Sequence, residues 1–287
     1  AGMLWTLNSR PRFPALAAAA LALAVVGAVI MAAAPFLGQG RAVMSNYVPV
    51  LDDGVFLFGL TLFGIGFALL IARNLLAPAR IAIGLDGEGA LRFGLNASVV
   101  AAAIALVALA WSWVEVPAEL SGKPYYELLF WGGGHVIQFT WTLLMLVAWL
   151  WLATLIGAPP PLSPRLAVLL FAIALASVFV VPVIYLAWDV ASIEHQRLQT
   201  WLMRFGGGLA ILPVGLAVLV GLARAAPGTA ATRPLRAALI SSLALFAIGG
   251  LIGFLIRGSD VRIPAHYHGS IVGVTLALMG LAYALLP

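Results

Sequence analysis

Two histidines two residues apart open the last apolar segment, in the sequence PAHYHGSIVGVTLALMGLAYALLP from residue 264 to residue 287. Imidazole is a common ligand of metal ions and of heme iron. Residues two apart on an α-helix point about 200° away from each other. We therefore expect His266 and His268 to face two separate pockets rather than to bind one metal ion together. The alternative is that both are interfacial residues hydrogen-bonded to backbone or water.

The composition around these histidines is that of a membrane protein. The 287 residues are 63% hydrophobic and 9% charged, whereas soluble domains carry about 25% charged residues. A helix needs roughly 20 mainly apolar residues to cross a bilayer. Such segments lie at about 15–37, 54–76, 96–117, 130–156, 165–188, 203–223, 236–256 and 266–286. We expect an all-α integral membrane protein, in which residues 1–287 form one transmembrane domain of eight helices within the lipid bilayer, and no nucleic-acid partner.

The basic residues predict an orientation. The first apolar segment follows Arg10 and Arg12 and is longer than the core of a signal peptide, so we interpret it as a retained span. Nine of the 15 Lys and Arg residues then fall on the side of the N-terminus, which the positive-inside rule places in the cytoplasm. We expect a bacterial inner-membrane protein with both termini cytoplasmic. The chain has no cysteine, which excludes disulfides, thiolate metal sites and c-type heme attachment within it.

This orientation gathers the four histidines near the outer face. His135 falls about five residues into the fourth segment, and His266 and His268 open the eighth from the same side. We expect His195 in a loop of the outer connection between the fifth and sixth segments. An ionisable residue inside a membrane segment is a candidate functional group by default, although a lone His135 is equally compatible with a structural role.

Two sequence stretches together resemble a known family. LFWGGGHVIQF around His135 and AHYHGSIVGVTLALMGLAYALLP around His266 and His268 resemble the catalytic subunit of the heme–copper oxidase superfamily. That superfamily includes cytochrome c oxidases, quinol oxidases and nitric oxide reductases. The resemblance implies that the eight segments correspond to helices three to ten of subunit I. It also implies that His135 matches a copper ligand, His266 the high-spin heme ligand and His268 the low-spin heme ligand.

Several positions depart from the family pattern. Trp188 and Asp189 stand where the family has two adjacent copper-binding histidines. Ile137 and Phe139 stand where many members have a glutamate and a tyrosine. The family's second helix, which carries the other axial ligand of the low-spin heme, has no counterpart among the eight segments. We therefore do not expect copper, and an active oxygen or nitric oxide reductase is the least favoured interpretation.

The resemblance and its departures lead to an electron-transfer function. We expect one heme b held by His266, with His135 as the distal ligand or a nearby polar group, and no catalytic residue in this chain. Arg257 and Arg262 would bind heme propionates or anchor the chain at the interface.

The expected partners are other membrane subunits of a respiratory-type complex, and a periplasmic electron carrier or quinol. One subunit could supply a histidine opposite His268 and so complete a second heme. A redox-active chain would be an oxidoreductase component. The alternative is a cofactor-free structural or assembly subunit.

Overall fold

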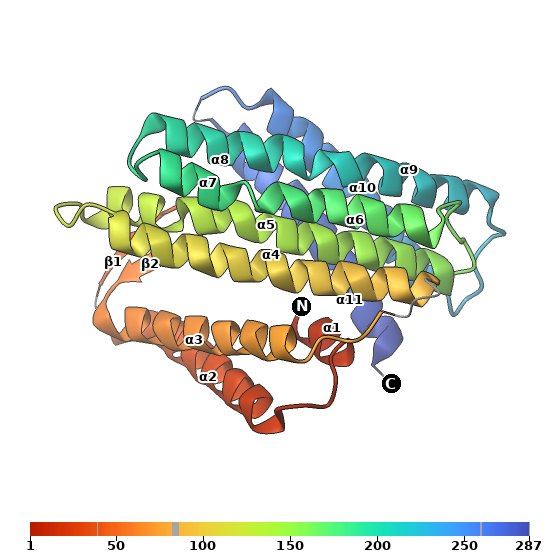
Figure 1. Cartoon of the computed structure of the whole chain (residues 1–287), viewed down its shortest axis with the longest axis horizontal. Helices are drawn as coiled ribbons and strands as arrows, with labels where there is room; N and C mark the ends of the chain where they lie inside the picture. The colour runs from red at the N-terminus through yellow and green to blue at the C-terminus, as the bar shows by residue number, and fades with distance from the viewer. Residues whose placement is uncertain (39, 82–85, 259, 287) are drawn as a thin grey trace.

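The computed structural model describes residues 1–38, 40–81, 86–258 and 260–286. Within these ranges, eight helical segments are long and apolar enough to cross a membrane. The protein is therefore an all-α integral membrane bundle of eight spans, as the composition predicts (Figure 1).

Five of the spans are built from single helices and three from two consecutive elements. The single-helix spans are α3 (Gly54–Leu76), α4 (Gly87–Glu115), α5 (Gly122–Leu155), α10 (Arg233–Leu255) and α11 (Arg262–Leu285). The composite spans are α2 (Pro14–Ala33) with η1 (Ala34–Leu37), α6 (Pro164–Val178) with α7 (Val181–Ala187), and α8 (Ile193–Gly206) with α9 (Gly208–Arg224). The short α1 (Gly2–Leu7) precedes them.

The bundle has two distinguishable ends. One carries an antiparallel hairpin of β1 (Arg41–Val43) and β2 (Val50–Asp52), the first turns of α5 and α11, and the joint between α7 and α8 (Figure 1). We call this the histidine end. The opposite end carries α1, the start of α4 and the end of α5.

Helix α5 lies at the centre of the bundle. It packs against α4, α6, α8, α9, α10 and α11. All residues from Leu143 to Trp149 are buried, so the helix is apolar around its whole circumference there, as expected of a helix surrounded by other helices. Because α5 also carries His135, this residue is fixed at the most heavily packed helix of the molecule.

Small residues allow the two helices of each outer hairpin, α2 with α3 and α10 with α11, to pack closely. A Cβ on Gly249 of α10 would lie 2.5 Å from the backbone nitrogen of Ser270 in α11, and one on Gly66 of α3 would lie 2.6 Å from that of Ala24 in α2. Such approaches are typical of membrane helix packing. The same does not hold for every glycine in these helices, because no described residue lies within 4 Å of such an added atom on Gly64 or Gly250.

The expected spans differ from the helices at their ends. Helix α4 begins at Gly87 instead of about residue 96, because the Asp86 carboxylate accepts from the Gly89 backbone N–H at 2.7 Å and caps a polar first turn. The fifth expected span is interrupted around Phe179 and Val180, just before Pro182 in the first turn of α7. Proline lacks the N–H that a continuous helix would need there.

Candidate functional site

The ring of His266 is held between α11 and α10. Its Nδ1 lies 2.7 Å from the carbonyl oxygen of Gly249. A carbonyl only accepts, so Nδ1 carries the proton and, in the neutral ring, Nε2 carries the lone pair. The ring packs closely on Gly253, where a Cβ would lie 2.7 Å from Nδ1. Metal-ligating histidines commonly donate their second N–H to a carbonyl in this way.

His268 points away from that contact. Its Nδ1 lies 2.7 Å from the carbonyl oxygen of Pro264, one turn earlier in α11, and the side chain is exposed. Nδ1 is again the donor, so in the neutral ring Nε2 carries the lone pair. The two histidines therefore use different surroundings, as their 200° separation on a helix predicts.

His135 is buried, and several groups surround its ring. The Nδ1 atom donates to the Trp131 carbonyl at 2.7 Å. The Tyr47 hydroxyl lies 2.7 Å from Nδ1 and 3.1 Å from Nε2, and since Nδ1 already donates to the carbonyl, Tyr47 can donate only to Nε2. The Thr200 hydroxyl of α8 lies 3.4 Å from Nε2. The lone pair of His135 is thus covered by side chains of the same chain.

Tyr47 is positioned by the loop between β1 and β2. The preceding residue, Asn46, binds the Glu127 carboxylate of α5 through its backbone N–H at 3.1 Å and its side-chain amide at 2.7 Å. Burial raises the pKa of Tyr47 well above its usual value, with further contributions from Tyr267 and Glu127. Its hydroxyl therefore stays protonated at neutral pH and lies between His135 on α5 and Tyr267 on α11.

His195 does not lie in a loop, so that expectation is wrong. It lies in the first turn of α8, where its backbone N–H is accepted by the Ser192 hydroxyl at 3.1 Å. Its ring meets Tyr185 edge-on with centroids 4.6 Å apart, and the side chain is only 1% exposed. The serine cap starts a new helix directly after the α7–α8 joint.

The four histidines do not form one cluster. Among the described residues, no three His, Cys, Asp or Glu side chains lie close enough together to hold a metal ion. The partners of His135 come from α5, α8 and the β1–β2 loop. Those of His266 come from α10 and α11. The structure brings His135 against Thr200 of α8, and it holds His266 against α10.

The two arginines near the start of α11 differ in their contacts. Arg262 donates from Nε to both carboxylate oxygens of Asp260, at 3.0 and 2.9 Å, and also pairs with it through Nη2. These bonds lower the pKa of Asp260. Arg257 follows the end of α10 and is exposed. Arg262 would have to leave Asp260 before it could bind another anion.

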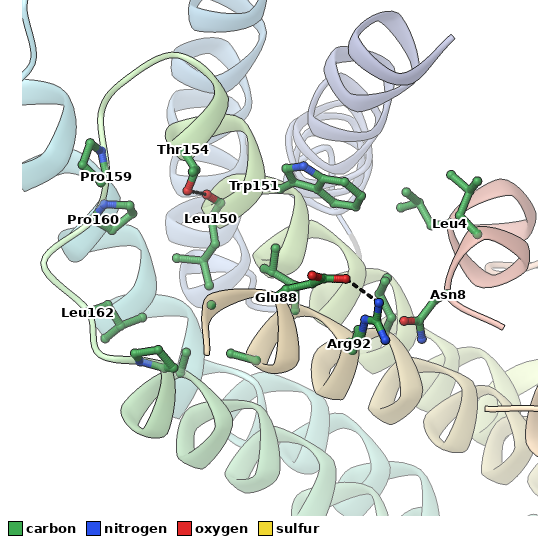
Figure 2. A pocket seen from close by; sticks show the side chains of 17 residues that line it. Leu4, Asn8, Glu88, Arg92, Leu150, Trp151, Thr154, Pro159, Pro160 and Leu162 are labelled. Carbon is green, nitrogen blue, oxygen red and sulfur yellow. Dashed lines mark hydrogen bonds and ion pairs between the residues drawn. The ribbon is translucent and has the colours of Figure 1, made fainter. Parts of the chain in front are cut away.

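A cavity of about 490 Å³ lies at the opposite end of the bundle, between α1, α4, the end of α5 and the α5–α6 connection (Figure 2). Its lining is mostly apolar, with Trp151 and Leu4 on its walls and the Glu88–Arg92 ion pair at its edge. Leu150 lies 15 residues after His135 on α5, about 22 Å along a helix. This cavity is therefore separate from the histidines.

Two residues at the histidine end were not recognised from the sequence. Tyr47 lies 88 residues before its partner His135, and no local spacing links them. Thr200 contacts His135 across the α5–α8 interface, in a region that was expected to be loop. The three consecutive glycines of WGGGH indicate that another part of the chain packs closely on this helix. A Cβ on Gly134 would lie 2.2 Å from the ring of Tyr47.

Comparisons with known proteins place the chain beside bacterial relatives. An uncharacterized protein of Rickettsia prowazekii (strain Madrid E) is 28% identical over 91% of this chain and 56% of its own length. An uncharacterized protein of Aquifex aeolicus (strain VF5) is 30% identical over 91% of this chain and 63% of its own length. The chain thus spans little more than half the length of these relatives. No family model matches it, and no solved structure shows a significant match.

Proposed function

We propose that this chain is a heme-binding subunit of a membrane electron-transfer complex, in which His266 would hold one heme b and His268 would help to hold a second heme. The bond between Nδ1 of His266 and the Gly249 carbonyl, at 2.7 Å, carries the proposal. His135 and His268 donate to the preceding turn of their own helices, whereas His266 donates to a neighbouring helix. Tertiary packing therefore sets the orientation of this ring and leaves Nε2 available as a ligand.

The surroundings of His266 and His268 fit the role of axial ligands. Gly253 allows the Nδ1–Cε1 edge of the His266 ring to approach α10 closely, which restricts its rotation. A bound heme b would supply one-electron transfer. The residues of this chain would hold the two imidazoles in the tautomer that presents Nε2.

The contacts around His135 restrict its access to a heme. Tyr47 and Thr200 lie against its Nε2 at 3.1 and 3.4 Å. A distal-ligand role would require the Tyr47 hydroxyl to move away. We therefore propose His135 as a buried hydrogen-bonding group beside the heme site, joined to α11 through Tyr47 and Tyr267.

The exposed side of His268 suits a further subunit. The side chain is exposed, so a histidine from another membrane subunit could lie opposite it and help to hold a second heme. We propose a bacterial inner-membrane location with the histidine end toward the periplasm, which follows from the distribution of Lys and Arg. An electron carrier in the periplasm, or quinol near that face, would then be the exchange partner.

The test is a reduced-minus-oxidised visible spectrum of the gently purified membrane protein, with a pyridine hemochrome assay for stoichiometry. We expect a b-type spectrum in wild type and loss of most heme from His266→Ala. His268→Ala should lose the second heme, which His268 would help to hold. The matched control is His195→Ala, which removes a histidine that packs on Tyr185 and should leave the heme content unchanged. Wild-type protein that is folded but heme-free would refute the proposal.

A cofactor-free structural subunit is the second candidate, and one observation favours it. The Tyr47 ring packs on Gly134, and the Tyr185 hydroxyl would lie 1.9 Å from a Cβ on Gly132. The space in front of the WGGGH segment is therefore filled by the chain's own aromatic side chains. A folded, heme-free preparation that still co-purifies with other membrane subunits would support this alternative.

A further inference from the structure

A shallow groove of about 280 Å³ follows one side of α8 at the histidine end. It lies next to the contact between Thr200 and His135, because Thr200 and Trp131 contribute to its wall. The lining residues are Trp131, Ile193, Gln196, Arg197, Thr200, Trp201 and Arg204. Neither the heme proposal nor the packing of the bundle makes use of this groove.

The groove has a concentrated positive charge. Arg197 and Arg204 are seven residues apart in α8, about two helical turns, so they lie on the same side. Among the described residues, neither guanidinium forms an ion pair, and no aspartate or glutamate lines the groove. Glu194 is exposed and lies one turn before Arg197 without pairing with it. Two unneutralised arginines on the same side of one helix favour an anionic ligand.

Aromatic side chains complete the groove. The Arg197 guanidinium lies over the Trp201 ring at 5.1 Å from its centroid, which fixes the direction of the cation. Trp131, on the facing helix α5, donates from Nε1 to the Gln196 carbonyl at 3.2 Å and so closes the groove on that side. Tryptophan and arginine together are typical of the headgroup region of a bilayer.

The surface that continues from the groove is apolar. Phe205, Leu209 and Leu212 follow Arg204 along α8 and α9, and they are 57%, 60% and 68% exposed. Such side chains face acyl chains in a membrane protein. Arg204 therefore lies at the boundary between lipid-facing apolar surface and polar surface, at the level where phosphate groups are found.

We propose that this groove binds the phosphate of an anionic phospholipid, with the headgroup against Arg197 and Arg204 and the acyl chains along α9. The lining supplies two cations for the phosphate, Gln196 and Thr200 as hydrogen-bonding groups for the headgroup, and exposed apolar residues for the chains. A free phosphate ion would use the arginines alone, so the apolar continuation favours a lipid.

The first test is a titration of the purified full chain in a neutral detergent, with bound lipid counted by native mass spectrometry. The titrants are phosphatidylglycerol, which is anionic, and phosphatidylcholine, which is zwitterionic. We expect Arg197→Gln/Arg204→Gln to bind the first phosphatidylglycerol about thirtyfold more weakly than wild type. Both side chains are at least partly exposed, so the double variant should fold. An unchanged melting temperature would confirm this.

The controls distinguish the loss of charge in general from the loss of these two arginines, and a lipid phosphate from a free phosphate ion. Arg224→Gln/Arg233→Gln removes the same charge from exposed positions at the opposite end and should keep the first affinity. Arg197→Lys/Arg204→Lys should recover part of it. Inorganic phosphate at millimolar concentration should not displace the lipid.

Three results would overturn the proposal. The first is an unchanged affinity of Arg197→Gln/Arg204→Gln for phosphatidylglycerol. The second is an equal affinity of the wild type for phosphatidylglycerol and phosphatidylcholine. The third is complete displacement of the lipid by phosphate, which would identify a site for a free anion.

Discussion

The hydroxyl of Tyr47 lies 3.1 Å from Nε2 of His135, although the two residues are 88 positions apart in the chain. This contact joins the β1–β2 loop to the central helix and covers the lone pair that a metal or heme iron would need. A residue outside the spans thus controls access to the Nε2 atom of the buried His135.

Tyr47→Phe should change how stability depends on alkaline pH. Burial raises the pKa of Tyr47, so the folded state keeps a proton that the unfolded state releases above about pH 10. This contribution to stability is complete below the unfolded pKa and is lost as the pH rises toward the folded one. The melting temperature should therefore fall less between pH 9 and pH 11 in Tyr47→Phe than in wild type.

The control for this experiment is Tyr283→Phe, which removes the hydroxyl of an exposed tyrosine on α11. At pH 7, Tyr47→Phe should cost about 1 kcal/mol of unfolding free energy through the lost hydrogen bond, and Tyr283→Phe about zero. An alkaline profile of Tyr47→Phe that matches wild type would show that Tyr47 is not buried against His135.

Alanine at the WGGGH glycines should destabilise the protein. A Cβ would lie 1.9 Å from the Tyr185 hydroxyl at Gly132 and 2.2 Å from the Tyr47 ring at Gly134. Each substitution should cost about 1–3 kcal/mol, because a ring must move in a packed interior. The added methyl groups of Gly64→Ala and Gly250→Ala meet no atom of the described part of the chain within 4 Å, so these variants should be neutral or stabilising by up to about 1 kcal/mol. Equilibrium unfolding in mixed micelles would measure the difference, and equal effects at all four positions would contradict it.

Gln199→Met should stabilise the bundle. Gln199 is fully buried in α8, and neither its Oε1 nor its Nε2 has a hydrogen-bond partner among the residues that the structure describes. Removing unpaired buried polar atoms from a similar volume should gain about 1–3 kcal/mol. Gln196→Met, one turn earlier and half-exposed, should change the stability little. A large loss of stability in Gln199→Met would instead show that Gln199 has a bound partner, such as an ordered water.

The absence of cysteine allows a direct test of orientation. Ala118→Cys places a thiol in the exposed α4–α5 connection at the histidine end, and Ala230→Cys places one in the exposed α9–α10 connection at the opposite end. With the histidine end toward the periplasm, a membrane-impermeant maleimide should label Ala118→Cys in permeabilised-outer-membrane cells. It should label Ala230→Cys only after lysis. The reverse pattern would place the histidines on the cytoplasmic side.

Composition and periodicity predicted where the helices lie in the sequence but not which helices contact one another. Long apolar segments predict spans because a bilayer leaves the backbone few alternatives, and the 200° rule predicted that His266 and His268 face different surroundings. The helix starts at Gly87 and Gly122 were missed because polar first turns extend beyond the apolar windows. The cap of α8 was missed although Ser192 and Glu194 are a recognisable helix-start pattern.

The candidate site was harder to predict than the fold. The partners of His135 and His266 come from other helices and from the β1–β2 hairpin. Such contacts depend on which helices are neighbours, and the sequence pattern of one helix carries no information on this. The resemblance to the heme–copper oxidase superfamily stays a prediction that the spectrum described above can test.

The bond from His266 to the Gly249 carbonyl also makes the orientation of the imidazole depend on the relative position of α10 and α11. The acceptor belongs to α10 and the donor to α11, and their separation is 2.7 Å. A slide of one helix along the other by about half a helical turn, or about 2.7 Å, would lengthen this bond to about 3.8 Å and break it, since hydrogen bonds weaken beyond about 3.2 Å. The ring would then be free to turn, and the direction of its Nε2 would change. Any subunit that docks on the exposed face of α10 could therefore alter the ligand geometry of His266 without touching it.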